Sequence, residues 1–161
     1  MNADAFRHFY GYHFWLNRRI WDEAVSQLSD DQYTQPLNYS RGSIRDQLVH
    51  LMNCENSWFS GLRGVDFPED ADPASFHTRE AFRAAWDAVE QNVRAYLANL
   101  TDDMLNTKPL QGEDAGLYLW QVLLHVVNHG TDHRAQILRQ LNDLGVQTEW
   151  QDYIFYCYGS Q

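Results

Sequence analysis

Four long segments of the chain repeat apolar residues at steps of three and four, the spacing that places them on one face of an α-helix. In the third segment, Phe82, Trp86 and Val89 begin a stripe that continues to Leu100. No segment alternates apolar and polar residues with period two over a sustained run, so no β-strand is expected. The sequence therefore predicts an all-α protein, a four-helix bundle. The four predicted helices cover about residues 3–28, 43–64, 78–100 and 115–144.

Local signals mark the ends of these helices. Ser43 is followed three residues later by Asp46, which resembles a capping box, and Gly145 stands where a helix commonly stops. The acidic, proline-containing loop at residues 64–77 is long enough to cross over between the second and third helices.

A chain of 161 residues can bury about 70% of its unfolded surface around one core. We therefore expect a single domain over residues 1–161.

The charge balance excludes several kinds of partner. The chain has 22 acidic against 12 basic residues, a formal net charge of -10, and Lys108 is its one lysine. Binding of nucleic acid or of an anionic membrane needs a positive field that this chain lacks. No run approaches the roughly 20 apolar residues of a membrane span, and no signal peptide or CxxC motif is present. A cytoplasmic protein without nucleic-acid or membrane partners is expected.

Seven histidines against two cysteines direct attention to imidazole chemistry. His125, His129 and His133 are spaced by four, and each such step turns about 40° and rises about 6 Å along a helix. All three lie on one face. Two imidazoles one turn apart can chelate one metal, whereas two turns apart they are too distant. The chelating pair is His125 with His129 or His129 with His133, and the spacing leaves both open.

A third ligand must come from another helix, because a catalytic site of this kind needs about three protein ligands and an open position. His50 is the candidate, since it lies in the second predicted helix within a run that also presents Cys54. Hydrogen-bonded core or surface histidines are the alternative interpretation. Burying several imidazoles without partners costs free energy, which favours a metal site for the evenly spaced histidines of the fourth predicted helix. His8, His13 and His77 are given no special role.

The stretch from His125 to Ile137, with His50 ahead of Trp58, resembles the DinB-like (YfiT/DinB) family of four-helix-bundle metalloproteins. Residues 15–19 and 152–156 are also similar to the ends of that family, so the resemblance covers nearly the whole chain. The family holds its metal with one histidine of the second helix and an HxxxH pair followed by Arg-x-Gln in the fourth. The resemblance therefore implies His50, His129 and His133 as ligands. His125 is then either a neighbour on the same face or a residue that supports the ligands or the pocket. Ala135 departs from the glycine that the family often has.

The resemblance also implies two activity classes, thiol transferases and thiol-dependent isomerases. Three neutral ligands leave a divalent ion its full charge, which favours a bound hydroxide or thiolate. Our hypothesis is a metal-dependent enzyme that activates a thiol or water, as an S-transferase or a hydrolase does, toward a small-molecule substrate. Zinc or nickel is the favoured metal among those that imidazole suits, with a low-molecular-weight thiol as a candidate second cofactor. The alternative is a non-catalytic protein, either a stress-related ligand-binding protein or a structural one, whose metal is structural or absent. In either case we expect a homodimer.

Several neighbours of the candidate ligands could complete the site. Cys54 lies one turn after His50 and is either a fourth ligand, a pocket residue or a small buried hydrophobe. Asp132 and Glu55 are candidate partners of the ligands or bases, with Glu55 alternatively pointing into the polar centre of the bundle. Asp132 and Arg134 flank a ligand, and the alternative interpretation of both is a solvent-facing charge. The candidate pocket walls are Trp15, Asn17 and Trp58. For the two tryptophans, packing in the core is the alternative.

Overall fold

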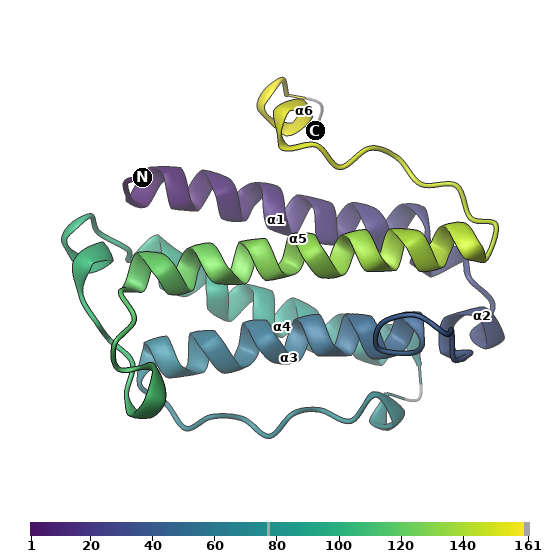
Figure 1. The fold of residues 1–161 in the computed structure, drawn as a ribbon, viewed down its shortest axis with the longest axis horizontal. Helices are drawn as coiled ribbons and strands as arrows, with labels where there is room; N and C mark the ends of the chain where they lie inside the picture. Colours follow the sequence, from purple (N-terminus) through teal and green to yellow (C-terminus); the bar gives the residue numbers. More distant parts are fainter. Residues whose placement is uncertain (77, 160–161) are drawn as a thin grey trace.

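The four long helices lie side by side in a computed structural model that describes residues 1–76 and 78–159 (Figure 1). Throughout these residues the regular structure is helical and includes no β-strand, which confirms the predicted all-α fold. None of the helices described is long and apolar enough to cross a membrane. His77 lies outside the described residues. The α-helices are α1 (Ala3–Glu23), α2 (Asp30–Thr34), α3 (Ile44–Arg63), α4 (Arg79–Ala98), α5 (Leu119–Asp143) and α6 (Tyr153–Cys157).

The start of α3 follows the sequence signal closely. Ser43 Oγ accepts a hydrogen bond from the Asp46 backbone N–H at 3.1 Å, and the Asp46 carboxylate accepts one from the Ser43 N–H at 3.2 Å. This capping box satisfies two of the backbone donors that a helix start leaves unpaired. At the other end, Gly64 adopts a left-handed conformation with φ of 68°, which closes the helix.

Two predicted helix boundaries are wrong, each because a short 3₁₀ turn replaces α-helix. The first long helix ends at Glu23 instead of residue 28, since Ala24 leaves the helical region and residues 25–27 form a 3₁₀ turn. The fourth begins at Leu119 instead of residue 115, since residues 112–114 form a separate 3₁₀ turn and Tyr118 is extended.

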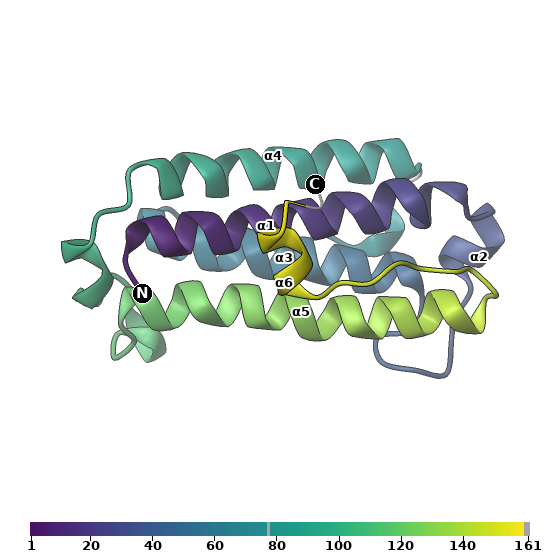
Figure 2. The same cartoon turned by 90° about the horizontal axis from the view of Figure 1, so that it is seen from above.

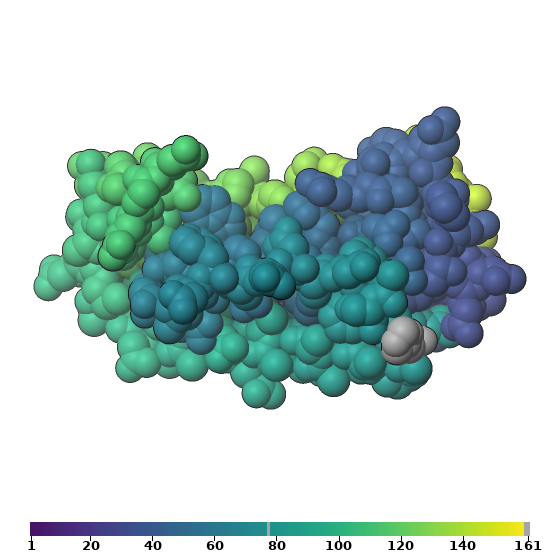
Figure 3. Space-filling model, turned by 90° about the horizontal axis from the view of Figure 1, so that it is seen from below, coloured from purple at the N-terminus to yellow at the C-terminus, as the bar shows by residue number. Residues whose placement is uncertain are grey.

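The segment after α3 returns along the bundle before α4 begins, so α3 and α4 start at the same end of the molecule (Figure 1). It is anchored at the middle of α3, where Asn53 exchanges two hydrogen bonds with the backbone of Ala71, at 3.0 and 3.1 Å. In the space-filling view this segment forms part of the surface beside α4 (Figure 3).

The tail after α5 packs on the outside of the bundle, and Figure 2 shows it running back between α1 and α5. Tyr12 donates its hydroxyl proton to the Gln151 carbonyl at 2.6 Å. The rings of Tyr153 and Tyr156 in α6 pack edge-on against Tyr12 at 5.2 and 5.7 Å between centroids. The tail therefore covers the middle of α1.

A buried polar cluster connects all four long helices. Glu55 of α3 accepts hydrogen bonds from His13 Nε2 of α1 at 2.8 Å and from Trp86 Nε1 of α4 at 3.1 Å. Arg134 of α5 donates to His13 Nδ1 at 2.9 Å and to Asn17 Oδ1 at 3.1 Å. Because Nδ1 accepts from a guanidinium, the proton of a neutral His13 is on Nε2 and is donated to Glu55. Burial lowers the pKa of His13, which keeps the ring neutral.

This cluster corrects one expectation from the sequence. Arg134 was expected to face solvent, yet it is 1% exposed. A buried guanidinium is tolerable only when it is paired, and His13 connects it to the Glu55 carboxylate. Arg134 is therefore an internal residue that ties α5 to α1.

The cluster requires α5 to approach α1 closely at Gly130, where a Cβ atom would lie 2.4 Å from His13 Cε1. Gly130→Ala should therefore displace the His13 ring and destabilise the fold by about 1–3 kcal/mol, the usual cost of overpacking. Gly116→Ala, where a Cβ meets no atom within 4 Å, is the matched control and should change stability by less than about 0.5 kcal/mol. Urea unfolding measures both. Equal midpoints for Gly130→Ala and wild type would contradict the packing described.

Candidate metal centre

Three imidazoles meet between α3 and α5. His50 comes from α3, and His129 and His133 come from consecutive turns of α5. One ring nitrogen of each lies within 4.8 Å of the others. His133 is buried, and the other two are half-buried, so the group is open on one side. Of the two pairs that the spacing left open, His129 with His133 is the pair that faces His50.

The distance between His50 Nε2 and His129 Nε2 is 3.3 Å. Two nitrogens bound to one tetrahedral zinc at about 2.0–2.1 Å are about 3.4 Å apart, so the spacing suits a shared ion. In the absence of an ion one ring can donate an N–H to the other at this distance, and a shared cation would instead accept a lone pair from each nitrogen. The donor set therefore fits a divalent metal that prefers imidazole.

Gln47 orients the third imidazole. His133 Nδ1 lies 3.2 Å from Gln47 Oε1, and since a carbonyl oxygen can only accept, His133 donates its Nδ1 proton and leaves Nε2 bare. Gln47 is fully buried, and its Nε2 donates to Ser40 Oγ at 3.0 Å and Gln136 Oε1 at 2.8 Å. Sequence reasoning missed Gln47. Its position three residues before His50 puts it on the same helix face, which is the signal that could have found it.

The segment before α3 is fastened beside this centre. Gln140 Nε2 donates to the Gly42 carbonyl at 2.8 Å, and the Ser40 hydroxyl donates to Gln136 Oε1. Arg41 stands between these two anchored residues. Its positive charge contributes to lowering the pKa of each of the three clustered histidines.

All three imidazoles are held in their neutral form. The pKa of His50 and the pKa of His129 are both lowered to about 4, chiefly by burial, with smaller contributions from the neighbouring imidazoles and from Arg41. Burial also lowers the pKa of His133, against an opposing effect of Asp132. Metal binding requires deprotonated ligands, so the group can accept a cation at neutral pH without first releasing protons.

Four other predicted site residues lie on or beside the face of the clustered histidines. Cys54 Sγ lies 3.6 Å from His50 Nε2 and 3.8 Å from His129 Nε2. The exposed His125 ring lies 5.6 Å from the His129 ring and packs edge-on against Trp58 at 5.2 Å, both between centroids. Asp132, also exposed, accepts a hydrogen bond from Gln136 Nε2 at 3.1 Å.

Two residues predicted as pocket walls lie elsewhere. Asn17 belongs to the buried polar cluster, where it bonds Arg134. Trp15 faces the tail, with its ring 5.5 Å from that of Tyr156 and with the Arg19 guanidinium stacked over it. Both predictions fail for the same physical reason. The side chains at these positions of α1 point toward the bundle interior or the tail, and not toward the seam between α3 and α5.

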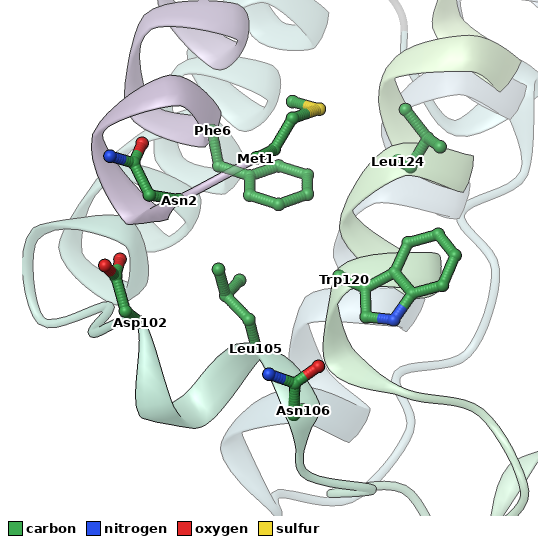
Figure 4. A pocket seen from close by; sticks show the side chains of 8 residues that line it. All are labelled: Met1, Asn2, Phe6, Asp102, Leu105, Asn106, Trp120 and Leu124. Atoms are coloured by element: carbon green, nitrogen blue, oxygen red, sulfur yellow. The ribbon is translucent and has the colours of Figure 1, made fainter.

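A separate cavity of about 460 Å³ lies where the starts of α1 and α5 meet the 3₁₀ turn at residues 103–106 (Figure 4). Apolar side chains and three polar side chains form its wall, and the clustered histidines take no part in it. The lining residues are Met1, Asn2, Phe6, Asp102, Leu105, Asn106, Trp120 and Leu124.

The fold and the site together define a helical-bundle protein with three imidazoles gathered between two of its helices. The DinB family model matches residues 1–161, and the chain belongs to that family. It is also similar to the protein named "Protein DinB" of Bacillus subtilis (strain 168), with 27% identity over 167 residues that cover 98% of this chain and 96% of that protein. The family expected from the sequence is therefore confirmed.

The lowered pKa values predict how the metal-free protein responds to acid. Ordinary histidines in the unfolded chain titrate near 6.5, while folded His50 and His129 titrate at about 4. Between these values the unfolded state binds more protons, so the free energy of unfolding should fall as pH falls from 6.5 toward 4. Denaturant unfolding with a chelator present, from pH 7 to 4.5, measures the slope.

The double variant His50→Gln, His129→Gln should show a shallower decline, because two of the groups that take up protons on unfolding are gone. His8→Gln, which replaces an exposed histidine of α1, is the control and should retain the wild-type slope. Equal slopes in the double variant and the wild type would contradict the assignment of acid sensitivity to this cluster.

Proposed function

We propose that the chain binds one divalent metal ion through His50, His129 and His133 and is a metal-dependent enzyme that activates a thiol or water toward a small electrophilic substrate. The observation that carries the proposal is the meeting of three ligand nitrogens within 4.8 Å between α3 and α5. A bound divalent cation would act there as a Lewis acid and lower the pKa of a thiol or water. Zinc or nickel is the proposed metal.

The residues of the chain support this activity in three ways. His133 is oriented by Gln47, and neutral rings at all three positions are ready to bind. The half-buried His50 and His129 leave one side of the group accessible to a small molecule. The charge of Arg41 beside the histidines favours an anionic group there, either a thiolate or a carboxylate on the substrate.

A structural metal site is the second candidate function. The observation in its favour is Cys54 Sγ within 3.6 Å of His50 Nε2, because four protein ligands are typical of closed, structural zinc sites. The accessible side of the histidine group favours the enzyme.

Calorimetric titration with zinc tests the metal site. Wild type should bind one zinc per chain. Loss of a residue that only hydrogen-bonds a metal ligand typically lowers metal affinity roughly 10–100-fold, so loss of the ligand itself in His129→Ala should lower zinc affinity by more than that. Zinc at about 100 times its Kd should stabilise wild type by about 2.7 kcal/mol. His125→Ala is the matched control, on the same face one turn away, and should leave affinity unchanged. A wild type that binds no stoichiometric divalent metal would contradict the proposal.

A small thiol separates thiol activation from water activation. Cobalt-substituted protein should change its visible spectrum when 2-mercaptoethanol is added, because a thiolate entering the metal's coordination sphere alters the ligand field. An unchanged spectrum would exclude the thiol-transferase form of the proposal and leave the water-activating form. A spectrum that responds equally in His129→Ala would show that the thiol acts elsewhere.

A further inference from the structure

We propose that Arg41 selects small molecules that carry a carboxylate for the open side of the metal centre. The inference rests on the proposed function and names the class of ligand that the centre takes. It comes from where the chain holds this arginine and from the lack of a counterion for it among the described residues.

The loop before α3 is fastened beside the histidine group. Leu37 donates its backbone N–H to the Gly42 carbonyl at 3.1 Å, which closes the loop on itself. Gln140 Nε2 of α5 donates to the same carbonyl at 2.8 Å, and Figure 2 shows this loop beside α5. The loop is therefore fixed to the helix that carries His129 and His133.

Ser40 connects the loop to one of the candidate ligands. Its hydroxyl oxygen accepts a hydrogen bond from Gln47 Nε2 at 3.0 Å, and Gln47 Oε1 accepts one from His133 Nδ1 at 3.2 Å. One buried side chain thus separates Ser40 from the centre, and the next residue is Arg41. The charge of Arg41 contributes to the lowered pKa of all three clustered histidines, which agrees with this placement.

The backbone on both sides of Arg41 adopts an uncommon conformation. Ser40 has φ of 54° and Gly42 has φ of 95°, both in the left-handed region. Glycine adopts this region without strain, but a serine there costs free energy. Residues held in such conformations cluster at ligand-binding sites, because the surrounding structure fixes them for a purpose other than stability. Here the two residues set the position of the arginine between them.

Arg41 differs from the other arginines in its lack of a partner. The 12 basic residues are Lys108 and eleven arginines, in a chain with a net charge of -10. Within residues 1–76 and 78–159, every arginine except Arg41 forms an ion pair or a hydrogen bond. Arg41 is exposed. Its guanidinium donors are therefore available to a ligand.

Asp132 is the acidic residue whose charge acts on the same rings. It opposes the lowering of the pKa of His129 and of His133. Its carboxylate accepts a hydrogen bond from Gln136 Nε2 at 3.1 Å, and no ion pair among the described residues joins it to Arg41. The carboxylate that Arg41 binds would accordingly come from outside the chain.

The position of Arg41 is unfavourable for metal binding by itself. A fixed positive charge repels a divalent ion, so a centre that only held metal would bind it better without Arg41. The charge becomes favourable when the small molecule at the metal is an anion. The planar fork of a guanidinium matches a carboxylate, to which it donates two parallel hydrogen bonds. The ligand class is therefore a small thiol or electrophile that bears a carboxylate.

Titration calorimetry on zinc-loaded, full-length protein tests the proposal. The probes are 3-mercaptopropionate and 3-mercaptopropionamide, which have the same thiol and differ in carboxylate against amide. Wild type should prefer the carboxylate, and the ratio of the two Kd values should fall by about 5–10-fold in Arg41→Gln at low salt, the loss of one charge-assisted pair. Arg41→Lys should keep part of the preference, because it keeps the charge without the fork.

Arg139→Gln is the matched control. It removes another exposed arginine, which lies on α5 and pairs with Asp143, and it should keep the wild-type ratio. Because Arg41 is exposed, its variants should fold as wild type does, and equal urea midpoints check this.

Propionate distinguishes the two molecules that could carry the carboxylate. It is added to zinc-loaded protein that is saturated with 3-mercaptopropionamide. Propionate binding that depends on Arg41 assigns the carboxylate to the electrophile, whereas a preference confined to the pair of thiols assigns it to the thiol.

Zinc affinity gives a readout that needs no small molecule. Arg41→Gln should bind zinc about 2–5-fold more tightly than wild type at low ionic strength, because a repelling charge is gone. Weaker zinc binding by Arg41→Gln would show that Arg41 supports the metal site itself and would overturn the proposal.

The remaining outcomes separate this inference from the proposed function. Wild type that binds zinc, with the same carboxylate preference and propionate binding in Arg41→Gln, overturns the role of Arg41 and leaves the three-imidazole centre intact. A preference lost equally in Arg139→Gln reflects the general surface charge and also overturns it. A wild type that binds no zinc overturns the proposed function, and this inference with it.

Discussion

The buried contact between Glu55, His13 and Arg134 is the constraint on which the arrangement of the bundle depends. A carboxylate and a guanidinium in the interior each lose several kcal/mol of hydration, and removal of one partner of such a pair typically costs about 3–5 kcal/mol. Here a neutral imidazole accepts from Arg134 and donates to Glu55, which connects the charges without direct contact. With Trp86 added from α4, these contacts join all four long helices in one register.

This register places the donors of the candidate metal centre. Glu55 directly follows Cys54 on α3, and Arg134 directly follows His133 on α5. Successive residues on a helix point about 100° apart, so one member of each pair faces the interior cluster while the other faces the seam between α3 and α5. A shift of one turn, about 5.4 Å, would break the cluster and separate His50 from the α5 histidines at the same time. The core and the site are therefore specified by the same contacts.

The sequence predicted the helices well because long amphipathic periodicity is decided locally. It failed at Ala24 and near residue 115, where short 3₁₀ turns end or delay a helix and apolar spacing carries no signal for them. The three imidazoles were predicted from spacing together with the family resemblance, since spacing alone could not choose between His125 and His133 as the partner of His129.

The groups that support the site were harder to predict. Arg134 and Gln47 are polar residues whose partners come from other helices, so their burial depends on a register that the local sequence does not encode. Asn17 was predicted as a pocket wall and lies instead in the interior cluster, for the same reason. A histidine such as His13, given no role from the sequence, becomes central because it lies between two buried charges.

X-ray absorption at the zinc edge tests the three-imidazole centre most directly. The sample is full-length protein loaded with one equivalent of zinc and passed through a desalting column. The expected result is retained zinc surrounded by three imidazole nitrogens at about 2.0–2.1 Å. Zinc lost on the column, or retained in a shell without the multiple-scattering pattern of imidazole, would contradict it.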